Sequence, residues 1–150
     1  MAGDFEQLAR RFCDFCERET SEGREAFVAE LERHLVTLYG AALELLPADP
    51  PEEDAPRIAH EEWRAVYDRV AGRLGAPGAY WLVYDPFVEE APVLSQLADD
   101  VADIYRDIRA GLALLDRRPA EVPSWEWRST FDSHWGRHAA SAIYALHMSP

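Results

Sequence analysis

The sequence predicts an all-α protein, a bundle of four long helices with a shorter helix at the N-terminus. The first observation is spacing: apolar side chains recur every three or four positions over long stretches, as in helices packed on a core. The second is composition, because 48% hydrophobic and 29% charged residues are typical of a soluble globular protein. The third is one exception, residues 80–87, which are aromatic and β-branched without helical spacing. We expect this stretch to be an extended strap across the bundle.

The periodic stretches define five expected helices. The first is Asp4–Arg18, and the second is capped by Thr20 or Ser21 and runs to Leu45. The third is Glu61–Leu74, the fourth starts between Pro92 and Ser95 and ends at Arg117, Arg118 and Pro119, and the fifth is Trp125–His147 after an N-cap at Ser124. The expected buried seam of the fourth helix is Leu94, Leu97, Val101, Ile104, Ile108, Leu112 and Leu115. The last helix holds three of the five tryptophans and three of the five histidines. We expect the other helices to pack around its aromatic face.

Residues 47–57 interrupt the helical pattern. This segment contains four prolines and four acidic residues, which exclude the interior of a helix. A chain of 150 residues is most simply one domain, and the segment is too short to divide it. We therefore expect a single helical domain, residues 1–150, with an exposed proline-rich connector at residues 47–57.

The charge balance limits the partners. The net charge of −13 would be repelled by nucleic-acid backbones and by anionic membranes. We therefore expect a protein or small-molecule partner, no nucleic acid and no membrane, and a monomer or homodimer. The sequence lacks lysine, which excludes a lysine nucleophile or Schiff base. Two cysteines and an N-terminus without the apolar run of a signal peptide indicate a cytoplasmic protein.

Four motifs occur in an order known from one protein family: EEWRAVYDRV, YWLVYDPF, LADDVADIYRDIRAGLALL and WEWRSTFDSHWGRHA. Over residues 61–147 the sequence resembles a bacterial family known only as domain of unknown function 5063. The N-terminal third fits that family in its helical character rather than motif by motif. The resemblance implies a small all-helical bacterial protein, and it implies no activity, cofactor or catalytic residue.

Cys13 and Cys16 form a CxxC motif, which occurs in redox-active pairs and in zinc sites. Redox-active pairs usually lie at a helix N-terminus, where the helix dipole lowers the thiol pKa. This pair lies inside an expected helix beside Asp14 and Glu17, whose negative charges raise a thiol pKa. The sequence has no second CxxC to complete a zinc site. We therefore interpret both cysteines as small buried residues.

The last two helices carry the residues most typical of a metal site. His134 and His138 are four positions apart on the last helix, and the fourth helix carries an acidic row, namely Asp99, Asp100, Asp103 and Asp107. The candidate metal ligands are Asp99, Asp103, His134 and His138. A helical wheel argues against this site, because it places Asp103 opposite the leucine seam and His138 toward the core. The two meet only if the fourth helix has a second buried interface.

Without that interface, the acidic row is a solvated face and His138 is a core residue with a hydrogen-bond partner. Arginines on neighbouring helices can then pair with the row. Within the fourth helix, Asp103 and Arg106 have the three-residue spacing of a local ion pair.

The sequence favours a non-catalytic interaction or ligand-binding module. It contains no GxGxxG, P-loop, GxSxG or HExxH signature, so no common enzyme class is indicated. The expected binding surface lies on the fourth and fifth helices and comprises Asp99, Asp100, Asp103, Asp107, Arg128, His134 and Arg137. The alternative is a metal-dependent enzyme with its Asp/His site between these helices. No cofactor is expected except, in the alternative, a divalent metal ion.

Overall fold

The computed structural model describes residues 2–19, 21–76, 78–118 and 123–149. The fold is all-α, as the sequence predicts, with the helices α1 (Ala2–Glu17), α2 (Arg24–Leu43), α3 (His60–Leu74), α4 (Leu97–Arg117), α5 (Ser124–Thr130) and α6 (Gly136–Met148). The π-helical segment η1 (Phe131–Trp135) joins α5 to α6 in one continuous helical run. Two short strands, β1 (Ala79–Leu82) and β2 (Val93–Gln96), complete the described structure. Among the described helices, none has the length and apolar character needed to span a bilayer.

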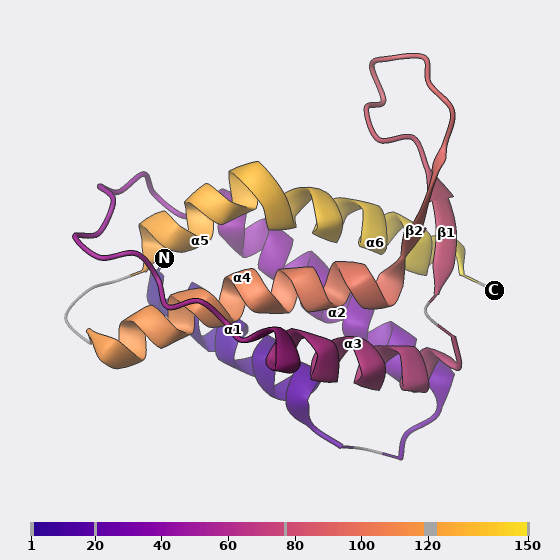
Figure 1. Ribbon diagram of the computed structural model, residues 1–150, viewed down its shortest axis with the longest axis horizontal. Coiled ribbons are helices and arrows are strands. Elements are labelled where there is room, and N and C mark those ends of the chain that lie inside the picture. The colour runs from indigo at the N-terminus through magenta and orange to yellow at the C-terminus, as the bar shows by residue number, and fades with distance from the viewer. Residues whose placement is uncertain (1, 20, 77, 119–122, 150) are drawn as a thin grey trace.

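Helix α4 is the centre of the bundle. It contacts α1, α3, α5 and α6, and Figure 1 shows it between the α5–α6 run on one side and α3 on the other. Its expected seam is buried at Val101, Ile104 and Ile108, yet Asp100 and Tyr105 are buried as well. Since α4 is covered on several sides, it has the second buried interface that Asp103 and His138 need in order to meet.

The aromatic core is supplied largely by the α5–η1–α6 run, which is continuous as the sequence predicts. Trp127 and Trp135 are fully buried, and both indoles pack against Phe5 of α1, with ring centroids 4.8 and 6.2 Å apart. Each indole nitrogen also has a backbone acceptor, because Trp135 Nε1 donates to the Trp127 carbonyl at 3.2 Å and Trp127 Nε1 to the Ile108 carbonyl at 3.1 Å. The two largest core side chains are therefore both packed and hydrogen-bonded.

The extended conformation expected for residues 80–87 is confirmed for the part that lies in β1. This strand is not alone, however, because it pairs antiparallel with β2, with Trp81 opposite Leu94. The resulting hairpin does not cross the bundle, and its loop extends beyond α6 in Figure 1. The expectation that α4 starts between Pro92 and Ser95 is wrong, since the helix begins at Leu97. Leu94 consequently lies in a strand and is 56% exposed instead of joining the core seam.

Two other expectations change at the helix ends. Ser21 does not cap α2, which begins at Arg24 after Gly23 without a side-chain cap, while Thr20 lies outside the described residues. Ser124 is the first residue of α5, and its N-cap is Pro123. Helix α4 ends at Arg117 as predicted, and Pro119 is outside the described part of the chain. The N-terminal helix α1, with 16 residues, is shorter than α2 and α4, with 20 and 21 residues, and α3 has 15.

The segment at residues 47–57 contains no helix or strand, and most of its side chains are exposed. It runs from the end of α2 toward the start of α3. Arg118, just after α4, forms ion pairs at 3.7 Å with Glu52 and with Glu53 of this connector. Such exposed pairs contribute at most about 1 kcal/mol each to stability, so they guide the path of the connector rather than hold the fold.

Candidate metal centre

The candidate site lies where α4 faces the junction of η1 and α6. Asp100, Asp103 and Asp107 are spaced by three and four positions, which places them on one face of α4. His134 and His138 project toward this face from the opposite helical run. The face that the wheel assigned to solvent is therefore an interface between two helices. The expectation that Asp103 points away from the core is wrong, because α6 covers that side of α4.

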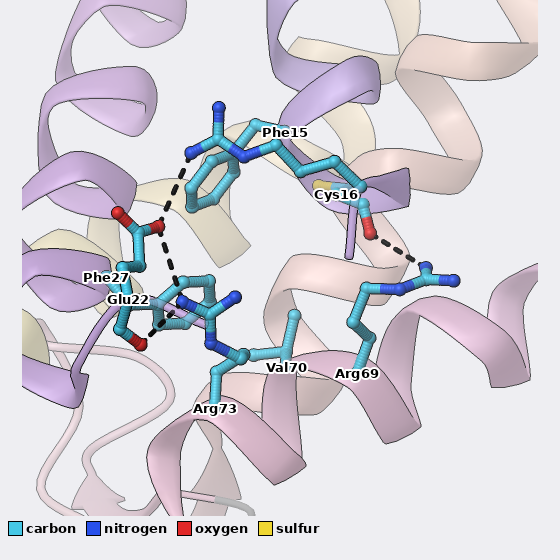
Figure 2. Close-up of a pocket in the computed structure, with 8 residues that line it drawn as sticks. Phe15, Cys16, Glu22, Phe27, Arg69, Val70 and Arg73 are labelled. Carbon is cyan, nitrogen blue, oxygen red and sulfur yellow. Dashed lines mark hydrogen bonds and ion pairs between the residues drawn. The ribbon is translucent and has the colours of Figure 1, made fainter. Parts of the chain in front are cut away.

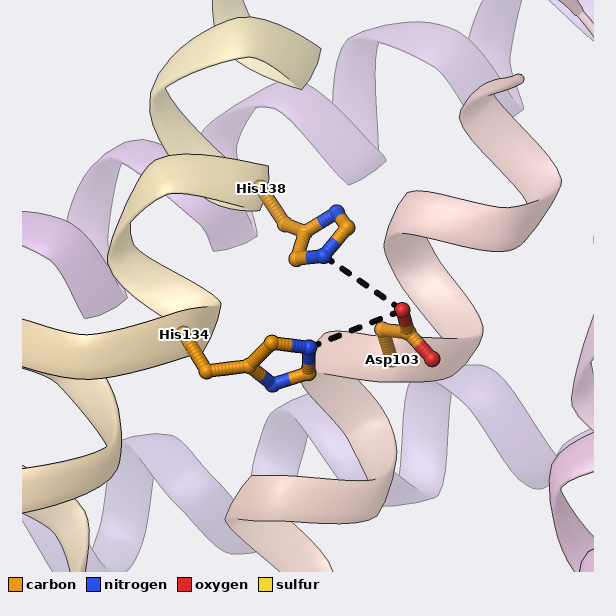
Figure 3. A group of neighbouring side chains, drawn as sticks. All are labelled: Asp103, His134 and His138. Carbon is orange, nitrogen blue, oxygen red and sulfur yellow. Dashed lines mark ion pairs between the residues drawn. The ribbon is translucent and has the colours of Figure 1, made fainter. Parts of the chain in front are cut away.

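Asp103 stands between the two imidazoles. Its Oδ2 atom lies 3.4 Å from His138 Nε2 and 3.7 Å from His134 Nε2 (Figure 3). Both separations exceed the usual 2.7–3.2 Å of an N–H···O hydrogen bond. One ligand atom from each of the three residues falls within 4.8 Å of the other two. The three side chains thus enclose a common point without bonding tightly to one another.

A second pair of carboxylates orients the two imidazoles from behind. His138 Nδ1 lies 2.7 Å from Asp100 Oδ1, and His134 Nδ1 lies 2.6 Å from Asp107 Oδ2. At these distances each Nδ1–H donates to its carboxylate, which leaves Nε2 as the ring nitrogen directed at Asp103. Metal-binding histidines commonly have this arrangement, because a carboxylate behind the ring fixes its tautomer and direction.

Asp103 is also held from its far side. Its Oδ1 atom accepts hydrogen bonds from Trp63 Nε1 of α3 at 2.8 Å and from the Arg106 guanidinium at 2.9 Å. The local ion pair predicted between Asp103 and Arg106 is confirmed. With Oδ1 occupied in this way, Oδ2 is the oxygen that remains directed toward the histidines.

The π-helical segment places His134. Residues of η1 turn more widely than in an α-helix, and such segments are often found at functional sites. The next residue is Gly136, where a β-carbon would lie 2.5 Å from the Phe131 carbonyl oxygen, so the wide turn requires glycine. The rings of His134 and His138, two positions before and two positions after this glycine, meet edge to face with centroids 4.8 Å apart.

Most of the site is shielded from water. The side chains of Asp100, His138, Asp107 and Asp103 are 5%, 12%, 14% and 15% exposed, whereas that of His134 is 32% exposed. Burial raises the pKa of Asp107, an effect that its contact with His134 partly offsets. Tyr80 of β1 donates its hydroxyl proton to Asp100 Oδ2, which gives that buried carboxylate a second partner. Solvent therefore reaches the centre chiefly along His134.

Comparison with known proteins adds a family but no activity. The family model described as Domain of unknown function (DUF5063) matches residues 1–149. The chain belongs to this family. The fold is similar to the crystal structure of protein BF1032 from Bacteroides fragilis, with a TM-score of 0.79 at 24% sequence identity. That similarity covers 97% of this chain and 91% of the other chain. No curated protein shows significant similarity to this family member.

Three residues of the expected surface are not part of the cluster formed by Asp103, His134 and His138. Asp99 is not among the three clustered ligands, although burial, followed by the charges of Asp103 and Asp100, raises its pKa. Arg137 is exposed and places its guanidinium 4.7 Å from the ring centroid of Tyr84 in the hairpin loop. Arg128 serves the other end of the bundle, where it donates to the last carbonyls of α2 and its following turn, at Ala42, Leu43 and Leu45.

Sequence reasoning did not place Trp63 and Tyr80 at the site. Tyr80 belongs to the stretch expected as a strap and Trp63 to the expected helix Glu61–Leu74, and in the structure each donates a hydrogen bond to a carboxylate of α4. The sequence carries one signal for such a role, because a partly buried indole N–H or phenol O–H usually finds a polar partner. It carries no signal that names the partner, which lies on a different helix.

The CxxC cysteines are free, buried core residues. Burial raises the pKa of both thiols, which keeps them protonated and unreactive. A small cavity of about 10 Å³ beside Cys16 is closed by structural contacts (Figure 2). In this cavity Arg69 donates to the Cys16 carbonyl at 2.9 Å, and Arg73 pairs with Glu22 at 3.4 Å. There is room there for one water molecule and not for a substrate.

Proposed function

We propose that this protein is a helical ligand-binding module whose ligand is a divalent transition-metal ion held by Asp103, His134 and His138. The observation that carries the proposal is the pair of Nε2 atoms directed at one carboxylate oxygen, at 3.4 and 3.7 Å. Two hydrogen-bonded Nδ1 atoms behind them fix that direction. The site has the ligand types and the supporting carboxylates of protein metal centres.

The separations agree with coordination geometry. Zinc–nitrogen and zinc–oxygen bonds are about 2.0–2.2 Å long, and neighbouring ligands of a tetrahedral ion are therefore about 3.4 Å apart. The two Nε2–Oδ2 distances of 3.4 and 3.7 Å lie close to this value. They are too long for strong hydrogen bonds and suitable for ligands that share an ion. The ligand set contains two imidazoles, which favours Zn²⁺, Fe²⁺ or Mn²⁺ over Ca²⁺ and Mg²⁺.

An ion also suits this face better than a protein partner. We expected the acidic row to be an open recognition surface, yet Asp100, Asp103 and Asp107 all have partners inside the molecule. Their low exposure leaves little carboxylate surface for a second protein to contact. We therefore assign the binding role to the space between the side chains rather than to their outer surface.

A second candidate function is a metal-dependent enzyme. Three protein ligands leave coordination positions open for water or substrate, as in catalytic metal sites. The partial exposure of His134, at 32%, favours access from solvent to these positions. Asp99 adds a carboxyl group beside the site whose pKa is raised by burial, a property common among general acids and bases.

We also infer a cytoplasmic location for this family member. The support is chemical: both cysteines are free thiols buried in α1, and reduced cysteines are typical of the cytosol.

The proposed ion is tested by thermal unfolding of untagged protein with and without Zn²⁺, Mn²⁺ or Fe²⁺. A ligand that binds only the folded form adds about 2.7 kcal/mol at a hundredfold excess over its Kd, which raises the Tm by about 5 °C or more. We expect this rise in the wild type and its loss in Asp103→Asn, since asparagine keeps an oxygen for Trp63 but is a poor metal ligand. Asp99→Asn is the matched control and should keep the rise. An equal rise in Asp103→Asn, or no rise with any metal, would contradict the proposal.

A further inference from the structure

The hairpin carries an unusual concentration of exposed apolar side chains. Within residues 81–94 the structure exposes seven large hydrophobic residues, among them Phe87 at 96% and Trp81 at 68%: Trp81, Val83, Tyr84, Phe87, Val88, Val93 and Leu94. The same segment extends away from the bundle in Figure 1. Exposed apolar surface gathered in one place marks an interaction site more often than isolated exposed residues do.

The two faces of the hairpin have different surroundings. Tyr80 and Leu82 alternate with exposed neighbours and are half-buried, and the Tyr80 hydroxyl is bonded to Asp100 of α4. Trp81 and Leu94 lie directly opposite each other in the register, so their side chains share the other face. Both are more than half exposed, at 68% and 56%. The hairpin is therefore fastened to the bundle by one face while its Trp81/Leu94 face is open.

Hydrogen bonds to the bundle hold this open face in place. The Leu97 amide donates to the Gly78 carbonyl at 3.0 Å, and the Tyr67 hydroxyl donates to Gln96 at 2.7 Å. An isolated two-stranded hairpin is marginal in water, so these bonds to α3 and α4 are what order it. A partner that binds the hairpin therefore meets a surface ordered in advance, which lowers the entropic cost of binding.

The hairpin is negatively charged. Residues 79–96 contain Asp85, Glu89 and Glu90 and no basic residue, in a chain whose net charge is −13. The backbone amides of Asp85 and Phe87 donate to Glu90 and to Asp85 respectively, at 2.9 and 3.0 Å, which orders two of the three acidic side chains of the loop. A hairpin with an apolar face on its strands and negative charges in its loop is complementary to an apolar segment that carries basic residues.

We propose that the Trp81/Leu94 face is a docking surface for an extended, basic segment of another protein. The hairpin has two strands in the described structure, and each has one edge without a partner strand, so an extended segment can add to the sheet. Its apolar side chains cover Trp81 and Leu94, and its basic side chains meet the acidic loop. A second copy of this chain does not meet these requirements, because it presents the same negative hairpin and the same net charge.

The test is selection of random short peptides, displayed on phage, against the full-length protein. We expect the enriched peptides to carry lysine or arginine and to alternate apolar with polar residues. The double variant Trp81→Thr/Leu94→Thr removes the apolar face but keeps β-forming residues, and it should weaken the selected peptides at least about tenfold. Val36→Thr is the matched control: it removes an apolar side chain of similar exposure, 51%, from α2, and should leave binding unchanged.

A second variant tests the charge. Asp85→Asn/Glu89→Gln/Glu90→Gln keeps the hydrogen-bond acceptors of the loop, and should weaken the same peptides and reduce the salt dependence of their binding. Circular dichroism verifies that each variant keeps its fold. The proposal is overturned if no peptide is enriched, if enriched peptides are acidic, or if they bind the Trp81/Leu94 variant as well as the wild type. Self-association of the wild type that the same double variant abolishes would also overturn it, because the occupant would then be a second copy.

Discussion

Trp127 packs its indole directly over Gly111. A β-carbon at position 111 would lie 2.1 Å from Trp127 Nε1, the same atom that donates to the Ile108 carbonyl at 3.1 Å. Close approach of α4 and α5 therefore depends on the absence of a side chain at one position. This contact places the start of the helical run that later presents His134 and His138.

Gly111→Ala should destabilise the protein by about 1–3 kcal/mol, because the added methyl group forces Trp127 out of its position. The matched control is Gly40→Ala in α2, where a β-carbon meets nothing within 4 Å. Alanine there should be neutral or stabilise the helix by up to about 1 kcal/mol. Urea unfolding of both variants measures the difference. Equal stabilities for the two variants would show that the α4–α5 contact adapts freely.

Trp135→Ala should cost about 3–5 kcal/mol, since it leaves a large cavity beside Phe5 and Phe131. The Trp135 side chain is fully buried, and its ring centroid lies 4.9 Å from that of Phe131. Trp81→Ala serves as the control, because Trp81 is 68% exposed and its removal should change stability by less than about 0.5 kcal/mol. A cost well under about 1 kcal/mol for Trp135→Ala would mean that the α5–η1–α6 run is peripheral to the fold.

Stability should fall in mild acid partly because of His34. Burial against Phe15, with ring centroids 4.7 Å apart, lowers the pKa of His34, although Glu30 opposes this. The unfolded chain, with a histidine pKa near about 6.5, then binds the proton more readily than the folded protein. The contribution of neutral His34 is thus fully present above that pH and is lost as the pH falls toward the lowered folded pKa.

His34→Gln removes this titration, so the variant should lose less stability than the wild type between about pH 7.5 and pH 5.5. The measurement is the free energy of unfolding in urea at both pH values. The two proteins differ only at position 34, so the comparison isolates the contribution of that side chain. A variant that loses as much stability as the wild type would show that His34 has an ordinary pKa.

The helices could be predicted because apolar spacing directly reports which side of a helix is buried. The stripe Phe27, Leu31, Leu35 and Leu38 of α2 is fully buried as expected. The same logic failed for α4, because a wheel assumes one buried side and α4 is covered on several. An acidic face of α4 is solvated or opposed by histidines according to where α6 packs. The spacing of residues within α4 gives no information about that position.

The hairpin and the π-helical segment escaped prediction for local reasons. Strand β2 has only four residues and directly precedes α4, so its apolar residues continued the helical spacing into Leu94. In η1 the wide turn depends on the contact between Gly136 and Phe131, which helical periodicity does not reveal. His134 and His138 were identified as a pair from their spacing. Their orientation by Asp107 and Asp100 required the structure.

Binding of Zn²⁺ at a defined stoichiometry tests the central claim most directly. Full-length, untagged protein is stripped of metal, equilibrated with Zn²⁺ by dialysis, and analysed for bound metal per chain. Our account predicts one tightly held ion in the wild type and in Asp99→Asn, and none in Asp103→Asn or in His134→Gln/His138→Gln. Wild-type protein that retains no ion, or variants that retain one as tightly as the wild type, would contradict a metal centre formed by Asp103, His134 and His138.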